Sequence, residues 1–117
     1  MEPSILNSTK KVLGLPSDYT PFDLDVLTHI NSTLATIHQL GVTDEVKYVT
    51  DENDVWDDLG LDRDQVNWAR TYIFLKVRLL FDPPGTSFLL EAMNKQIEEH
   101  EWRLNLSYEL KQSDEVA

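Results

Sequence analysis

Two helix-length stretches separated by a double proline constrain the fold of this chain more than any other feature. Hydrophobic residues recur every three or four positions between residues 66 and 106, which is the spacing of one helical face. Pro83 has no backbone donor and Pro84 disfavours the α conformation in the residue before it, so the first helix has to end near Phe81. The glycine and threonine that follow allow a turn and a cap for a helix from Ser87 onward. Four residues define this helical hairpin: Pro83, Pro84, Gly85 and Thr86.

Two shorter helices are predicted before the hairpin. Residues 5–13 form the first, ended by Gly14 and Pro16. The second carries an apolar face over residues 27–37 and ends at Gly41. We expect a side-chain cap for it from the segment around Pro21, namely from Asp18 or Thr20.

The segment between these helices and the hairpin is harder to classify. Residues 42–54 include a short alternating pattern that indicates an extended arm or a β-hairpin. A single helical turn around Trp56 follows, and Asp62 is expected to cap the long helix. The predicted fold class is therefore all-α: a small helical bundle built on the long hairpin, with a short extended arm or β-hairpin between helices. We expect one domain over residues 1–111 and a polar C-terminal tail over residues 112–117.

The composition excludes several classes of protein. The 117 residues include 10 Lys or Arg and 21 Asp or Glu, and the formal net charge is −11. This charge repels nucleic acid and anionic membranes. The chain has no cysteine, which excludes disulfides, thiolate chemistry and cysteine zinc sites. Its apolar runs are too short to span a bilayer, and Glu2 and Pro3 after Met1 do not indicate a secretion signal.

One group of carboxylates invites an enzymatic interpretation. Glu98, Glu99 and Glu101 lie on one predicted helix, and a pair of them could share a divalent cation as in all-α, metal-dependent nucleotide pyrophosphohydrolases. That chemistry needs a second acidic pair on the facing helix, which instead carries Arg70 and Arg78 along its length. We therefore interpret the glutamates as a solvated face and predict that the protein is not an enzyme.

Other ligand patterns are also incomplete. The stretch 51–62 has Val55 and Trp56 where an EF-hand loop needs an oxygen ligand and a glycine. The three histidines are scattered without metal-ligand spacing and are expected at helix surfaces or boundaries: His29, His38 and His100. We predict no catalytic, cofactor or metal site.

A surplus of apolar residues points to protein partners instead. Several hydrophobic side chains lie outside the predicted core faces, and such surplus is typical of interaction surfaces. The alternative is that they fold back into one core, which is equally compatible with the position of Trp56. The candidate interface residues are Ile5, Leu6, Trp56, Trp102, Leu106 and Leu110.

The hairpin sequence also carries a family resemblance. Residues 72–106, with Phe-Asp-Pro-Pro-Gly-Thr-Ser-Phe-Leu-Leu at 81–90, closely resemble head–tail connector proteins of tailed bacteriophages that infect actinobacteria. Residues 5–14 and 19–25 are similar to the opening helix and the second-helix entry of the same family. The resemblance covers nearly the whole chain, although residues 42–54 match only in character.

The resemblance implies a structural role in the virion. Connectors of this family are small helical adaptors that form a ring, expected to have twelve copies, beneath the portal protein. By this resemblance the chain is synthesised in the host cytoplasm, joins the head–tail interface, extends the DNA channel and receives a downstream neck or tail-completion protein. DNA then passes through without specific binding during ejection. The alternative is a stand-alone helical interaction or regulatory module.

An acidic cluster fits that role. A channel wall with negative charge lets DNA slide, whereas DNA-binding proteins neutralise phosphates with basic groups. The alternative is that the cluster is a solvated outer loop that only aids solubility. The cluster expected to line or rim the channel consists of Asp51, Glu52, Asp54, Asp57 and Asp58.

Overall fold

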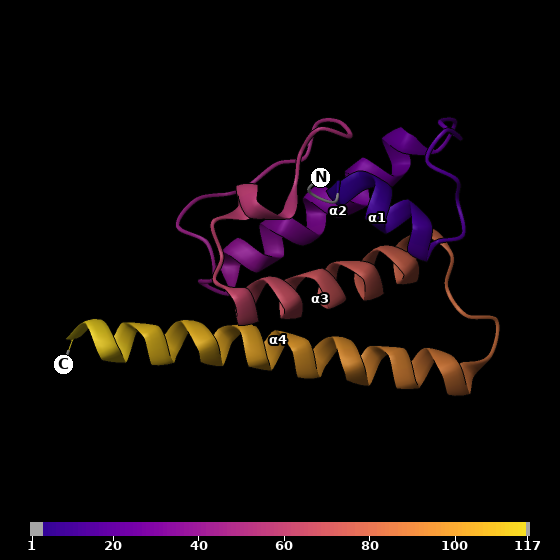
Figure 1. Cartoon of the computed structure of the whole chain (residues 1–117). Helices are drawn as coiled ribbons and strands as arrows, with labels where there is room; N and C mark the ends of the chain where they lie inside the picture. The colour runs from indigo at the N-terminus through magenta and orange to yellow at the C-terminus, as the bar shows by residue number, and fades with distance from the viewer. Residues whose placement is uncertain (1–3, 117) are drawn as a thin grey trace.

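The protein is a layered arrangement of helices around one central helix. The computed structural model describes residues 4–116, except for the side chains of residue 107 and residues 111–116. In Figure 1, α1 and α2 lie on one side of α3, and α4 runs along its other side. This confirms the all-α fold class. The elements are α1 (Ile5–Val12), α2 (Asp23–Gln39), the 3-10 turn η1 (Trp56–Leu59), α3 (Arg63–Phe81) and α4 (Ser87–Val116).

The hairpin boundaries are those that the sequence predicts. Helix α3 ends at Phe81 and α4 begins at Ser87. The Oγ1 atom of Thr86 accepts a hydrogen bond from the backbone N–H of Leu89 at 3.3 Å, which satisfies one of the free amides at the helix start. The ribbon of α4 continues through residues 112–116, which the sequence assigned to a polar tail.

The N-caps of α3 and α2 differ in how well the sequence predicts them. Asp62 caps α3, with its Oδ1 atom 2.8 Å from the backbone nitrogen of Gln65, as predicted. Helix α2 instead begins at Asp23 with Phe22 as N-cap and no side-chain cap, so the prediction of Asp18 or Thr20 is wrong. The centre of the Phe22 ring lies 5.5 Å from the centre of the Phe81 ring, so a tertiary contact accompanies the start of the helix.

The core is centred on α3. Its buried face packs against α2, and α1 and η1 contribute side chains to the core on the same side. Burying these side chains contributes roughly 1.5–3 kcal/mol each before chain entropy is subtracted. The fully buried hydrophobic residues of α2 and α3 are Val26, Ile30, Leu34, Ile37, Ala69, Tyr72, Ile73 and Val77.

The 42–54 arm is held by side-chain contacts, not by a sheet. No strand forms within residues 4–116; the backbone there makes only an isolated bridge between Ser4 and Val55. Asn31 on α2 holds the arm, because its Nδ2 atom donates to the Val49 carbonyl at 3.0 Å and its Oδ1 atom accepts from the Val49 amide at 2.7 Å. The arm is therefore irregular, and the β-hairpin alternative is wrong.

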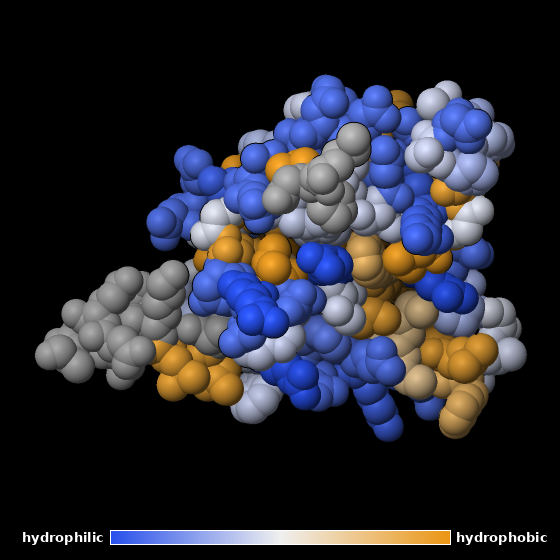
Figure 2. All heavy atoms as spheres, in the orientation of Figure 1, coloured by the Kyte–Doolittle hydropathy of each residue, from blue (hydrophilic) through white to orange (hydrophobic). Residues whose placement is uncertain are grey.

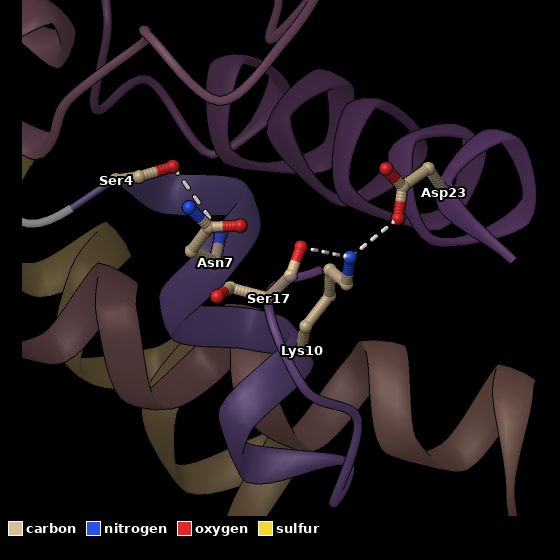
Figure 3. A network of polar contacts seen from close by, with 5 residues as sticks. All are labelled: Ser4, Asn7, Lys10, Ser17 and Asp23. Atoms are coloured by element: carbon tan, nitrogen blue, oxygen red, sulfur yellow. Dashed lines mark hydrogen bonds and ion pairs between the residues drawn. The ribbon is translucent and has the colours of Figure 1, made fainter. Parts of the chain in front are cut away.

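An ion pair between buried Lys10 and partly exposed Asp23 joins α1 to the start of α2. Lys10 is 1% exposed, and its Nζ atom lies 2.8 Å from Oδ1 of Asp23 and 3.1 Å from the carbonyl oxygen of Ser17. Figure 3 shows the lysine reaching from α1 toward both partners. Because a buried charge is costly without such partners, this contact fixes the path of the chain between the two helices.

Candidate interaction surfaces

The predicted interface residues divide into two groups. Ile5, Leu6 and Trp56 are 1%, 3% and 3% exposed, so they belong to the core of the subunit itself. Helix α1 packs onto α2 and α3, and the Trp56 ring meets the ring of Phe74 edge-on at 5.9 Å. Their assignment to a partner surface is therefore corrected: the short first helix and η1 complete the core instead.

The other predicted interface residues remain accessible. Trp102 is 64% exposed and Leu110 is 59% exposed, whereas Leu106 is half-buried. The inner stripe of α4 contains Ile97 and Leu104, so these three side chains lie on the opposite, outer side of the helix. We call Trp102, Leu106 and Leu110 the outer α4 patch. That it contacts a partner stays a prediction.

A second apolar surface was missed by the sequence analysis. Phe88 is 78% exposed, Leu89 is 54% exposed and Leu80 is 50% exposed, and we call these three residues the hairpin-end patch. Figure 2 shows hydrophobic atoms gathered at this end of the molecule. Leu89 and Leu90 are adjacent near the start of α4, and Leu89 is exposed whereas Leu90 is half-buried. Leu90, Ile97 and Leu104 recur every seven positions, and this spacing in the sequence indicates that they share the inner face of α4.

Polar contacts fix the inner side of α4. The Tyr72 hydroxyl donates to Oε2 of Glu101 at 2.8 Å. Burial, followed by the hydrogen bond and negative charge of Glu101, raises the pKa of Tyr72. Further along, Nδ2 of Asn105 donates to the carbonyl of Leu40 at 3.1 Å. These contacts hold α4 in one register against α3 and the end of α2.

The acidic cluster is partly explained by its own loop. Oδ2 of Asp54 accepts from the backbone amides of Thr50 at 2.8 Å and Asp51 at 3.2 Å. The Thr50 amide is the largest cause that lowers the pKa of Asp54. Asp58 similarly accepts from the Val55 amide at 2.9 Å. These carboxylates keep their charge and stabilise the turn, so part of the cluster has a structural role within its own loop.

Two members of the cluster are available for other contacts. The side chains of Glu52 and Asp57 are exposed and make no hydrogen bond or ion pair within the described part of the chain. Their carboxylates are therefore the ones through which the cluster could act on DNA or on another protein.

Two carboxylates of α4, Glu99 and Glu101, are engaged in structural contacts. Glu101 accepts from Tyr72, and Glu99 pairs with Arg103 at 2.7 Å. The Nδ1 atom of His100 lies 2.8 Å from the Gln96 carbonyl.

Among residues 4–116 with described side chains, no group of three or more His, Asp or Glu residues is placed to hold a metal ion. No helix in the described part of the chain is long and apolar enough to cross a membrane.

The chain is thus a small all-α protein with exposed apolar surfaces. The chain matches the family model described as phage connector protein over residues 5–111. It therefore belongs to the phage connector protein family and is a component of the phage particle. The comparisons with curated proteins and with solved structures gave no match. The narrower resemblance to actinobacteriophage connectors stays a prediction.

Proposed function

We propose that this protein forms a ring of twelve copies beneath the portal, where it extends the DNA channel and links the capsid to the next neck or tail-completion protein. The observation that carries the proposal is the family match over residues 5–111. A connector has to meet more than one protein, and the chain leaves two apolar surfaces exposed after its own core is complete, the hairpin-end patch and the outer α4 patch.

The proposal is tested in phage particles that lack this gene. We expect the deletion to leave DNA-filled heads without tails, and wild-type protein supplied in trans to restore infectious particles. Electron microscopy of neck complexes from the rescued particles measures whether a ring lies under the portal. Tailed, infectious particles without the gene would contradict the proposal.

A pair of variants tests the outer α4 patch. Trp102→Ala combined with Leu110→Ala removes two exposed apolar side chains, so we expect subunits that fold normally but rescue tail attachment poorly. The matched control is Tyr48→Ala, which removes a 68% exposed aromatic side chain outside both patches. Equal rescue by the double variant and the control would remove the outer α4 patch from the interface.

We propose that the acidic cluster rims the DNA channel. Its test uses Glu52→Lys with Asp57→Lys, since these two carboxylates hold no part of the loop. In the assembled ring the lysines would displace counterions from DNA phosphates, so we expect slower DNA release at low salt than at high salt. The control, Asp18→Lys with Asp82→Lys, changes the charge equally at exposed positions away from the cluster. Release that matches the control at both salt concentrations would place the cluster outside the channel.

We also propose that the protein has no catalytic activity. Glu99 and Glu101 are already paired with Arg103 and Tyr72, which supports a structural interpretation of the α4 glutamates. The test is nucleotide hydrolysis with magnesium or manganese. Turnover by the wild type that is lost in Glu98→Gln with Glu101→Gln would establish an enzyme instead.

A further inference from the structure

Two cations without ion-pair partners line the same hollow of this acidic protein. Lys11 on α1 and Arg70 on α3 form no ion pair within the described part of the chain. Both line a pocket of about 270 Å³ between α1, η1 and α3. In a chain with a net charge of −11, carboxylates are abundant, yet none of the described ones neutralises this position. The pocket residues are Ser8, Lys11, Val12, Trp56, Arg70 and Phe74.

Two residues of this pocket also carry a buried N–H group without a partner. The Nε1 atom of Trp56 and the Nε atom of Arg70 are buried and have no hydrogen-bond partner in the described structure. Trp56 is itself 3% exposed, and the Arg70 guanidinium carbon lies 5.3 Å from the centre of its ring. Buried donors without acceptors are costly to leave in place. Because its lining includes the two cations Lys11 and Arg70, the pocket fits an anionic ligand, and a carboxylate is the simplest one.

The walls of the pocket describe the neighbour of that carboxylate. Val12 is 43% exposed and Phe74 is half-buried, so an apolar wall lies beside the two cations. A matching ligand carries an acidic group and a large apolar group side by side.

The outer side of α4 presents this combination. Glu98 is exposed and unpaired within the described residues, and Trp102, one helical turn later, is 64% exposed. Helix α4 lies across α3 from α1 (Figure 1), so a subunit cannot place its own Glu98 in its own pocket. A second copy can.

We propose that the pocket of one subunit binds the Glu98 side chain of a second copy, with Trp102 of that copy covering the Val12 and Phe74 wall. The contact joins two different surfaces, so repetition generates a head-to-tail assembly that can close into a ring. The inference rests on the proposed function, because it names the contact between neighbours in the ring.

The chain contains no cysteine, which makes site-specific cross-linking direct. One preparation carries Lys11→Cys, another carries Glu98→Cys, and the two are mixed under conditions where electron microscopy shows rings with the portal. A short thiol cross-linker should give covalent dimers in the mixture and a ladder of oligomers with the double variant. Arg63→Cys mixed with Glu98→Cys is the matched control, because Arg63 is an exposed cation outside the pocket.

Charge reversal tests the same contact without a cross-linker. Lys11→Glu and Glu98→Lys should each weaken ring assembly by roughly tenfold or more, and combining them in one chain should restore it. Arg63→Glu makes the same charge change as Lys11→Glu and should leave assembly unchanged. Rings that form normally but give neither the cross-link nor the charge-swap rescue would overturn this contact while leaving the connector function intact. Failure to form any ring would overturn the proposed function and this contact together.

Discussion

Helices α3 and α4 are the two arms of one hairpin, yet they are buried very differently. On α3, Ala69, Tyr72, Ile73 and Val77 are all 0% exposed. On α4, the buried hydrophobic side chains among those described are only Ile97, at 4% exposure, and Leu104, at 0%. Helix α3 lies between two layers of helices, whereas α4 has a neighbour on one side (Figure 1).

This difference in burial suggests different roles for the two helices of the hairpin. Hydrophobic residues on α3 meet partners from the same chain, and their burial stabilises the subunit. Trp102 and Leu110 on the outer side of α4 stay mostly exposed, so removing them changes subunit stability little. Substitutions of similar size on the two helices should therefore have unequal effects on folding and unequal effects on assembly.

The largest expected effect is loss of a buried α3 side chain. Ile73→Ala leaves a cavity at a fully buried position and should lower the free energy of unfolding by about 2–5 kcal/mol. Leu110→Ala, at a 59% exposed position, should change it by less than about 0.5 kcal/mol. Denaturant titration of both variants measures the contrast. Similar losses for the two would mean that α4 is buried as deeply as α3 in solution.

The next effect concerns the contact that holds the far end of α4. Gly41 has a φ of 87°, and a Cβ atom added there would lie 2.6 Å from the Tyr108 ring. Gly14 has a φ of 80° with nothing within 4 Å of an added Cβ. Alanine at either site should cost about 1–2 kcal/mol through backbone strain, and Gly41→Ala should cost about 1–3 kcal/mol more through overpacking.

The difference between the two glycine variants isolates the Tyr108 contact. Thermal or denaturant unfolding of Gly14→Ala and Gly41→Ala under the same conditions provides the measurement. Equal losses would show that α4 leaves the end of α2 at no cost, and that its last turns are not part of the folded subunit.

The parts of the fold that the sequence predicts correctly are those set by neighbouring residues. The double proline and Thr86 determine the hairpin turn, and Asp62 with Gln65 forms the cap of α3 within four residues. At the start of α2, Phe22 packs against the distant Phe81, a contact that cannot be inferred from neighbouring residues.

The candidate surfaces were harder to predict because burial depends on which element covers which face. Ile5 and Trp56 looked surplus only because the face of α3 that they cover was not assigned to them. Leu89 and Leu90 are adjacent in sequence, and the choice between them requires the packing angle of α4. The three-and-four spacing leaves that angle open, whereas the hydrogen bond between Tyr72 and Glu101 fixes it.

The smallest expected effect tests that hydrogen bond. Tyr72→Phe removes the hydroxyl that donates to Glu101 and should lower stability at neutral pH by about 0.5–1.5 kcal/mol. The matched control is Tyr48→Phe, which removes a hydroxyl from a 68% exposed side chain and should have no measurable effect. Unfolding by denaturant at pH 7 measures both variants.

The pH dependence of the same variant distinguishes a buried hydrogen bond from a simple packing change. Burial and Glu101 raise the pKa of Tyr72 in the folded chain, whereas an unfolded tyrosine ionises near pH 10. Above about pH 10 the unfolded chain therefore releases this proton while the folded chain retains it, and stability falls as pH rises. Wild-type protein and Tyr48→Phe should share this loss, whereas Tyr72→Phe lacks the titrating group and should lose less, so its deficit at pH 7 should shrink between pH 10 and 11. Parallel curves for all three proteins across that range would mean that the hydroxyl is solvated, and that α4 is held to α3 by its narrow apolar stripe alone.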